Sequence, residues 1–163
     1  MISIAVCDDN EITAQEISEK VKQCCPIEAE VSVFYHIKDI LFSIHNENKL
    51  FDIIFMDIEF DVSSGIEASK QINAWHPDCQ IIYITNYTNY FTSVYETSHI
   101  YYILKKDIDT YLSTALKKAI QQIAKINQYY LIIQSKQQHI RIAQSKILFL
   151  CRCYYNTPHN YLL

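Results

Sequence analysis

The sequence predicts an α/β fold: a doubly wound sheet of five parallel strands with helices on both faces. Short apolar runs alternate along the chain with stretches of helical periodicity, which is the pattern of repeated strand–helix units. The runs are nearly continuous rather than alternating, as expected for strands that helices cover on both faces. Four of the runs also stop at an acidic, hydroxyl or amine side chain. Because the carboxyl ends of parallel strands share one edge of a sheet, these polar groups are expected to meet.

The first third of the chain gives three strands and two helices. Residues 2–7 predict a short buried strand, and residues 11–23 follow with apolar side chains on one helical face. VSVFY at 31–35 predicts a second strand, and a helical stretch containing residues 40–44 follows it. Residues 51–56 are rich in Ile and Phe and too short for a core helix, so they predict a central strand.

The pattern then repeats twice. Residues 66–75 predict a helix that ends before a proline, and residues 80–84 predict the fourth strand. An aromatic and Thr-rich stretch at 87–98 predicts a weak helix, and IYYIL at 100–104 predicts the fifth strand. From 108 to 126, apolar residues recur at steps of three and four, which indicates an amphipathic helix.

The character of the sequence changes near residue 127. Residues 1–127 are expected to form one domain, and residues 128–163 a short β-rich fragment. Antiparallel strands are predicted at 130–134, 139–143 and 146–151. So few residues cannot bury a core comparable to that of a normal domain, so the fragment is interpreted as incomplete.

Composition excludes several classes of protein. A formal net charge of -4 gives no overall basic field, which argues against a protein whose main work is binding phosphate backbones. The six cysteines lack the spacing of a zinc site, so reduced thiols in a cytoplasmic protein are expected. No segment approaches the roughly 20 apolar residues that span a bilayer, and no leader precedes the first strand. We therefore expect a soluble protein with no membrane partner.

The polar residues at the strand ends carry the functional prediction. Asp8 and Asp9 follow the first strand, Asp57 the third, Thr85 the fourth and Lys105 the fifth. A carboxylate that attacks a phosphoryl group is opposed by charge repulsion, and a cluster of carboxylates is unfavourable without a cation. Mg²⁺ prefers such oxygen ligands, while an amine and a hydroxyl can bind the transferred group. The pattern therefore predicts phosphoryl transfer to an aspartate with Mg²⁺.

Each residue alone has a more ordinary interpretation. An acidic pair after a strand is more often a solvated turn or a helix N-cap, and Asp9 or Asn10 would cap the following helix well. A single Lys after a strand is usually solvated, and Thr85 or Asp57 could be ordinary strand-end residues. Four independent placements of such residues at the ends of four strands would be improbable, and this favours the functional interpretation.

On these residues the chain resembles the receiver domain of two-component response regulators, over essentially all of residues 1–127. The matching positions are the acidic pair, the phosphoacceptor, the hydroxyl residue and the lysine of that family, here Asp8 and Asp9, Asp57, Thr85 and Lys105. The resemblance implies a flavodoxin-like fold, as in CheY-like receivers.

The resemblance also implies a function and its site. A sensor histidine kinase would donate a phosphoryl group to Asp57, in a self-catalysed transfer rather than a turnover reaction. Mg²⁺ would be bound by Asp9, Asp57 and the backbone carbonyl of Glu59, with Asp8 acting mostly through water. Lys105 would pair with the bound phosphoryl group.

Two further positions match the family. Tyr102 matches a switch aromatic that turns inward when Thr85 engages the phosphoryl group, although it could also be an ordinary packed tyrosine among 13 in the chain. Gly65 is the single glycine of the chain, and it falls after Asp57 where the family has one. We expect it there because the backbone needs a conformation that a side chain would disfavour.

Three positions depart from the family pattern. Asp61 and Lys106 stand where prolines are common, and Asn86 replaces the usual small residue after the hydroxyl position. Asn86 is expected to narrow access to the phosphoryl group and to change the rate of its hydrolysis.

The tail from 130 to about 155 resembles the opening strands of the LytTR DNA-binding domain, as in regulators of the AgrA and LytR type. Residues 128–163 would be a truncated LytTR domain, so transcription control and binding to promoter DNA are expected only where that domain is complete. Receivers of the family also pair, so a homodimer through the face containing 87–98 is expected.

Two alternatives belong to other classes. The chain could be a receiver-only interaction module, or phosphate sink, that never reaches DNA. It could also be an aspartyl-phosphate hydrolase of the haloacid dehalogenase kind, but that class needs an Asp-x-Asp pair after the first strand. Here Asp8 is followed by Asp9 and Asn10, and Asp57-Ile58-Glu59 lies on the wrong strand.

Overall fold

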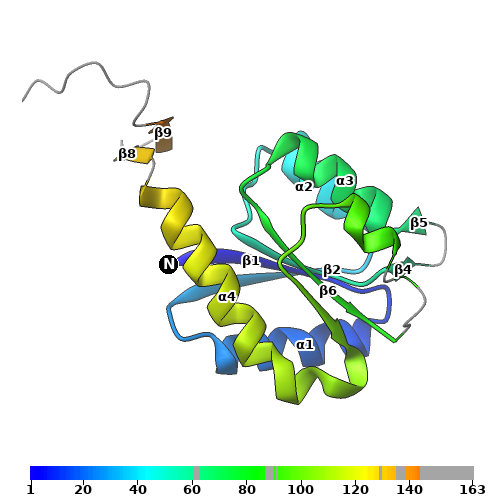
Figure 1. Ribbon diagram of the computed structural model, residues 1–163. Helices are drawn as coiled ribbons and strands as arrows, with labels where there is room; N and C mark the ends of the chain where they lie inside the picture. Colours follow the sequence, from blue (N-terminus) through cyan, green and yellow to red (C-terminus); the bar gives the residue numbers. More distant parts are fainter. Residues whose placement is uncertain (61–62, 87–89, 91, 129, 135–138, 144–163) are drawn as a thin grey trace, which may run out of the picture. The chain divides into compact units, whose positions relative to one another are not determined.

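The computed structural model describes residues 1–60, 63–86, 90, 92–128, 130–134 and 139–143. Its main sheet has five parallel strands in the order β2-β1-β3-β6-β7 (Figure 1). These strands are β1 (Ile2–Cys7), β2 (Ala29–Phe34), β3 (Ile53–Met56), β6 (Gln80–Thr85) and β7 (Tyr101–Leu104). The predicted doubly wound α/β fold is therefore confirmed.

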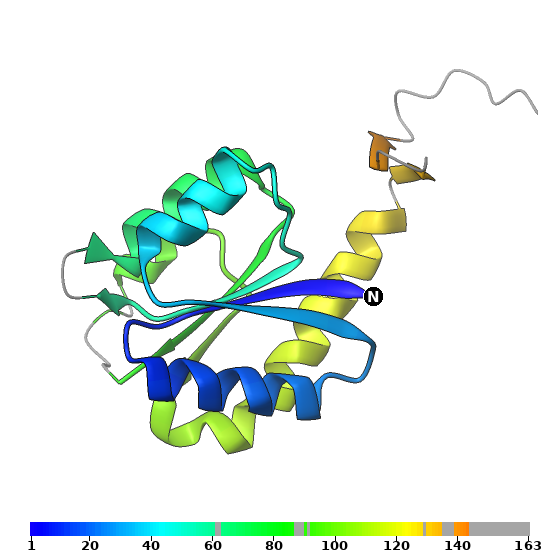
Figure 2. The same ribbon diagram turned by 180° about the vertical axis from the view of Figure 1, so that it is seen from behind.

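Four α-helices of the described residues cover the sheet. Helices α1 (Glu11–Cys24) and α4 (Ile108–Gln128) lie on one face, and α2 (Ile37–His45) and α3 (Gly65–Trp75) lie on the other (Figures 1 and 2). Every residue of β3 is buried. Along β3, side chains alternate between the core beneath α1 and α4 and the core beneath α2 and α3. This two-sided burial explains why the strand is a continuous apolar run.

The order of the strands fixes where a site can form. The order in which strands are added reverses at β1: β2 lies on one side of β1, and β3 follows on its other side. In open α/β sheets, ligands bind outside the carboxyl ends of the strands at such a reversal. Here that position lies between the ends of β1 and β3.

Two segments differ from the sequence predictions. The described part of the predicted helix at 87–98 contains only a short 3-10 helix, η1 (Ser93–Glu96). The loop after β3 contains a small antiparallel hairpin of β4 (Glu59–Phe60) and β5 (Ser63–Ser64), which periodicity did not indicate because each strand has only two residues.

The chain divides into two compact units, 1–125 and 126–163. In the second unit, β8 (Tyr130–Gln134) and β9 (His139–Ala143) pair antiparallel, with Ile132 opposite Arg141. These are the first two strands predicted for the tail, and the third, at 146–151, lies outside the described residues. Among the described helices, none has the length and apolar character needed to cross a bilayer.

Candidate functional site

Three carboxylates converge where β1 and β3 end. Asp8, Asp9 and Asp57 each offer an oxygen that lies within 4.8 Å of those of the other two. The backbone holds these residues side by side, because the Asp57 N–H donates to the Cys7 carbonyl at 2.9 Å, continuing the pairing of β3 with β1. The spatial meeting expected from the strand ends is thus present in the structure.

Lys105 reaches this cluster from the end of β7. Its Nζ lies 2.6 Å from Asp8 Oδ2 and 2.6 Å from Asp57 Oδ2, and its side chain is only 16% exposed. Asp8 is 1% exposed. One ammonium group therefore faces two buried carboxylates, with a third carboxylate, that of Asp9, beside them.

Burial and pairing with neighbouring charges together set the pKa values of Asp57 and Lys105. Burial raises the pKa of Asp57 above its usual range, and the hydrogen bond and charge of Lys105 offset this only in part, while the charge of Asp8 adds to it. Burial alone would lower the pKa of Lys105, but its contacts with Asp57 and Asp8 outweigh that effect, so the pKa is raised. Lys105 therefore stays charged, and the cluster of carboxylates is left short of positive charge.

The donor set fits a hard divalent cation. Asp8 Oδ2 is buried and pairs with the Lys105 ammonium group at 2.6 Å. Asp57 Oδ1 accepts from the Ile58 N–H at 2.6 Å, which orients that carboxylate. Mg²⁺ and Ca²⁺ are bound through such carboxylate oxygens, together with backbone carbonyls and water.

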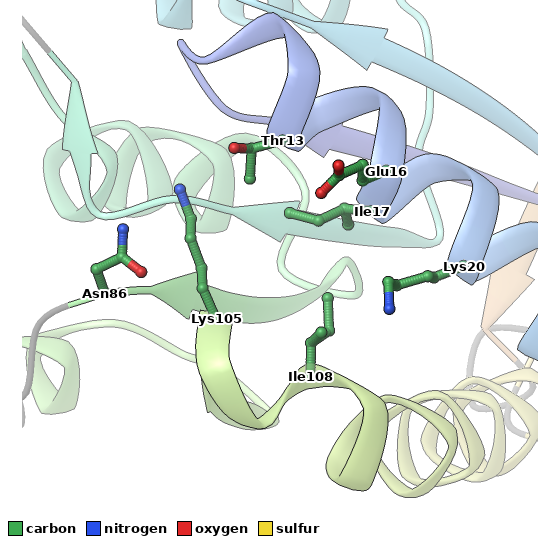
Figure 3. Close-up of a pocket in the computed structure, with 7 residues that line it drawn as sticks. All are labelled: Thr13, Glu16, Ile17, Lys20, Asn86, Lys105 and Ile108. Carbon is green, nitrogen blue, oxygen red and sulfur yellow. The ribbon is translucent and has the colours of Figure 1, made fainter.

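The cluster opens into a cavity of about 360 Å³, whose lining includes Asp9, Asp57, Glu59, Asn86 and Lys105. A second cavity of about 240 Å³ adjoins it, since Lys105 and Asn86 line both. Figure 3 shows this second cavity between the side chains of α1 and those of Lys105 and Ile108. Asp9 and Asp57 thus line a cavity, whereas Asp8 is buried behind them in the cluster.

Residues 4–121 match the family model described as the response regulator receiver domain. The chain belongs to this family. An uncharacterized response regulatory protein of Vibrio cholerae is 31% identical over 72 residues, which are 44% of this chain and 28% of that protein. The chain therefore spans well under half the length of this curated relative.

Solved structures agree with the family in their fold. The DrrB receiver domain in its BeF3-activated form is 24% identical with a TM-score of 0.64, over 74% of this chain and 98% of that one. The response regulator TrrA of Thermotoga maritima, in complex with Mg²⁺ and BeF, is 23% identical with a TM-score of 0.62, over 73% of this chain and 99% of that one. A DNA-binding response regulator of the LuxR family from Staphylococcus aureus is 20% identical with a TM-score of 0.62, over 73% of this chain and 98% of that one.

The two residues predicted to act as a switch lie on the neighbouring strands of this receiver. Thr85 is completely buried at the end of β6, in register with Leu104 of β7. Tyr102 is half-buried and packs against the core beneath α2 and α3. Burial raises the pKa of Tyr102, and the charge of Asp57 raises it further, so the phenol lies within the field of the predicted phosphoacceptor.

Gly65 is required for a reason that the sequence analysis did not give. Its φ is not positive, so the expected unusual backbone conformation is absent. Instead, the Gly65 N–H donates to the Ile58 carbonyl at 2.8 Å, and a Cβ on Gly65 would lie 1.9 Å from the Asp57 backbone oxygen. Close approach of the start of α3 to the backbone at the end of β3 excludes a side chain.

Two further residues lie near the site, and the sequence analysis foresaw one of them. Asn10 caps α1, its side chain accepting from the Thr13 N–H at 3.0 Å, which was anticipated only as an alternative to metal binding by the acidic pair. Tyr90 was not foreseen, and it donates a hydrogen bond at 2.5 Å to Glu59, which lines the larger cavity. No sequence pattern indicated this contact, because Tyr90 lies in an aromatic stretch without clear periodicity.

Proposed function

We propose that this receiver accepts a phosphoryl group on Asp57 from the phosphohistidine of a sensor histidine kinase, with Mg²⁺ bound beside it. The observation that supports this most strongly is the meeting of three carboxylates and Lys105 at the carboxyl edge of β1, β3 and β7. In the transfer, an Asp57 oxygen bonds to phosphorus as the phosphorus–nitrogen bond breaks, and the imidazole leaves.

The residues of the site have separate roles in this proposal. Asp9 and Asp57, with the backbone carbonyl of Glu59, would bind Mg²⁺ directly, and Asp8 would act mostly through water. When bound, Mg²⁺ supplies positive charge to the phosphoryl oxygens. Lys105 exchanges its present contact with Asp57 Oδ2 for a phosphoryl oxygen, which keeps its charge where negative charge accumulates.

The proposed response begins at Thr85. Its hydroxyl donates to a phosphoryl oxygen, and Tyr102 then turns inward toward the space beside it. Such a rearrangement alters the face of β7 and the segment before it, where two copies of the receiver would pair.

We also propose that residues 1–127 form the receiver and that 128–163 form part of a LytTR-type DNA-binding domain. The β8–β9 pairing supports a β-rich module directly after the receiver. Transcription control through promoter DNA would require the complete module. A gel-shift titration with promoter DNA tests it, and a protein that accepts phosphoryl groups without shifting DNA would instead be a receiver-only module.

The central experiment is incubation with acetyl phosphate and Mg²⁺, followed by intact and peptide mass spectrometry. We expect a stable gain of one phosphoryl group on Asp57 that is lost in Asp57→Asn and without Mg²⁺. Asp52→Asn is the matched control, because Asp52 precedes the same strand at the opposite edge, where it accepts from the Ser3 N–H at 2.9 Å. Steady turnover of phosphate monoesters, without a stable adduct, would contradict the proposal.

A further inference from the structure

Glu59 places a fourth carboxylic acid at the mouth of the site. It lines the cavity of about 360 Å³ together with Asp57 and Lys105, but it is not part of the cluster formed by Asp8, Asp9 and Asp57. A glutamate side chain is long enough to move within such a space. Its position therefore decides how much negative charge, and how strong a base, faces the phosphoryl group.

The hydroxyl of Tyr90 holds this carboxylate. It donates to Glu59 Oε1 at 2.5 Å. The contact joins the loop after β3 to the connection between β6 and β7, which are 31 residues apart in sequence.

Tyr90 is itself anchored. Its ring is half-buried and packs against the core beneath α2 and α3, the same core against which Phe60 and Tyr102 pack. A phenol with a packed ring presents its hydroxyl at a nearly fixed point, since only two side-chain torsions must be held. The hydrogen bond thus fixes the glutamate carboxylate rather than following it.

We propose that Tyr90 is a positioning residue that prolongs the phosphorylated state by restraining the Glu59 carboxylate. This inference rests on the proposed function. In the hydrolysis that ends this state, a water oxygen bonds to phosphorus and the bond from phosphorus to the Asp57 oxygen breaks, which releases phosphate and the free carboxylate. The attacking water must also lose a proton.

A carboxylate free to enter the cavity can take that proton and pass it to the departing phosphate, so it acts as a general base. A carboxylate held by Tyr90 is occupied by a hydrogen bond and kept at the cavity wall. Release of the restraint should therefore speed hydrolysis. We expect a roughly tenfold effect, below the ~10²–10⁴ typical of a base fixed in its reacting position.

The test measures the decay of phosphorylated protein, prepared with acetyl phosphate and Mg²⁺, after the donor is removed. Tyr90→Phe keeps the packed ring and removes the hydroxyl, so its decay should be about ten times faster. Tyr95→Phe is the matched control, because Tyr95 lies on η1 with 82% of its surface exposed, and its decay should equal that of the unaltered protein.

A double substitution separates positioning from general loosening of the fold. Glu59→Ala keeps the backbone carbonyl, and Tyr90→Phe should have no effect in that background because the base is gone. An unchanged or slower decay in Tyr90→Phe, or an equal acceleration in the Glu59→Ala background, would overturn the inference. Failure of the unaltered protein to take up a phosphoryl group would instead count against the proposed function.

Discussion

At the scale of single residues, Lys105 supplies the positive charge that Asp8 and Asp57 share. Replacing it by Gln should destabilise the protein in a chelating buffer by about 1–3 kcal/mol, less than the ~3–5 of a fully buried pair because Lys105 is partly exposed. Mg²⁺ should restore much of this loss, since it would neutralise the same carboxylates. Urea unfolding with chelator and with Mg²⁺ measures both effects.

Lys106→Gln is the matched control for this prediction. Lys106 is the next residue and is exposed, so the same change of charge should leave stability nearly unaltered in both buffers. A loss in Lys105→Gln that Mg²⁺ does not reduce would argue that Lys105 matters only for packing.

Gly65 gives a prediction about backbone packing. Gly65→Ala places a methyl group against the Asp57 backbone oxygen, so the start of α3 or the loop after β3 must move. We expect a loss of about 1–3 kcal/mol in urea unfolding, as for other overpacked sites, together with slower phosphorylation. Glu11→Ala, at the exposed first position of α1, should be nearly neutral. An unchanged stability of Gly65→Ala would show that the loop adapts without strain.

At the scale of elements, the connection from β6 to β7 is tied to α3. Asn73 of α3 donates to the Ser98 carbonyl at 3.1 Å and accepts from the Ser98 N–H at 2.8 Å. Lys70, also on α3, pairs with Glu96 at 2.7 Å. These contacts fix the position of the residues before β7, the strand that carries Tyr102.

Asn73→Ala should release this connection. Loss of two hydrogen bonds should cost about 1–2 kcal/mol, and the Ser98 N–H should exchange with solvent much faster. Hydrogen-exchange mass spectrometry resolves the segment. Gln71→Ala, on the exposed side of the same helix, should leave exchange unchanged, and equal protection in both variants would mean that Asn73 does not restrain the connection.

The same segment shows where sequence patterns reach their limit. Strands such as β3 and β6 were predictable because burial on both faces demands a continuous apolar run. Within the described residues, the weak helix predicted at 87–98 is reduced to the short 3-10 helix at Ser93–Glu96. Contacts from α3 hold the end of that segment. The α3 residues lie more than 20 positions away in the sequence, and local periodicity carries no information about such distant contacts.

At the scale of the whole molecule, strand order explains why the site could be anticipated. Parallel strands ending at one edge bring together residues separated by up to about a hundred positions, and β1 and β3 are neighbours in the sheet. Residue types at strand ends were enough to name Asp8, Asp9, Asp57 and Lys105. The sharing of Lys105 between two buried carboxylates, and the restraint of Glu59, depend on side-chain geometry that no strand pattern contains.

A crystal structure of the protein with Mg²⁺ and beryllium fluoride tests the central claim most directly, because fluoroberyllate imitates a phosphoryl group on a carboxylate. We expect fluoroberyllate bonded to Asp57 and contacted by Lys105 and Thr85. The cation should be bound by Asp9, Asp57 and the Glu59 carbonyl. Fluoroberyllate at another carboxylate, or a cation bound away from the edge shared by β1 and β3, would contradict the account.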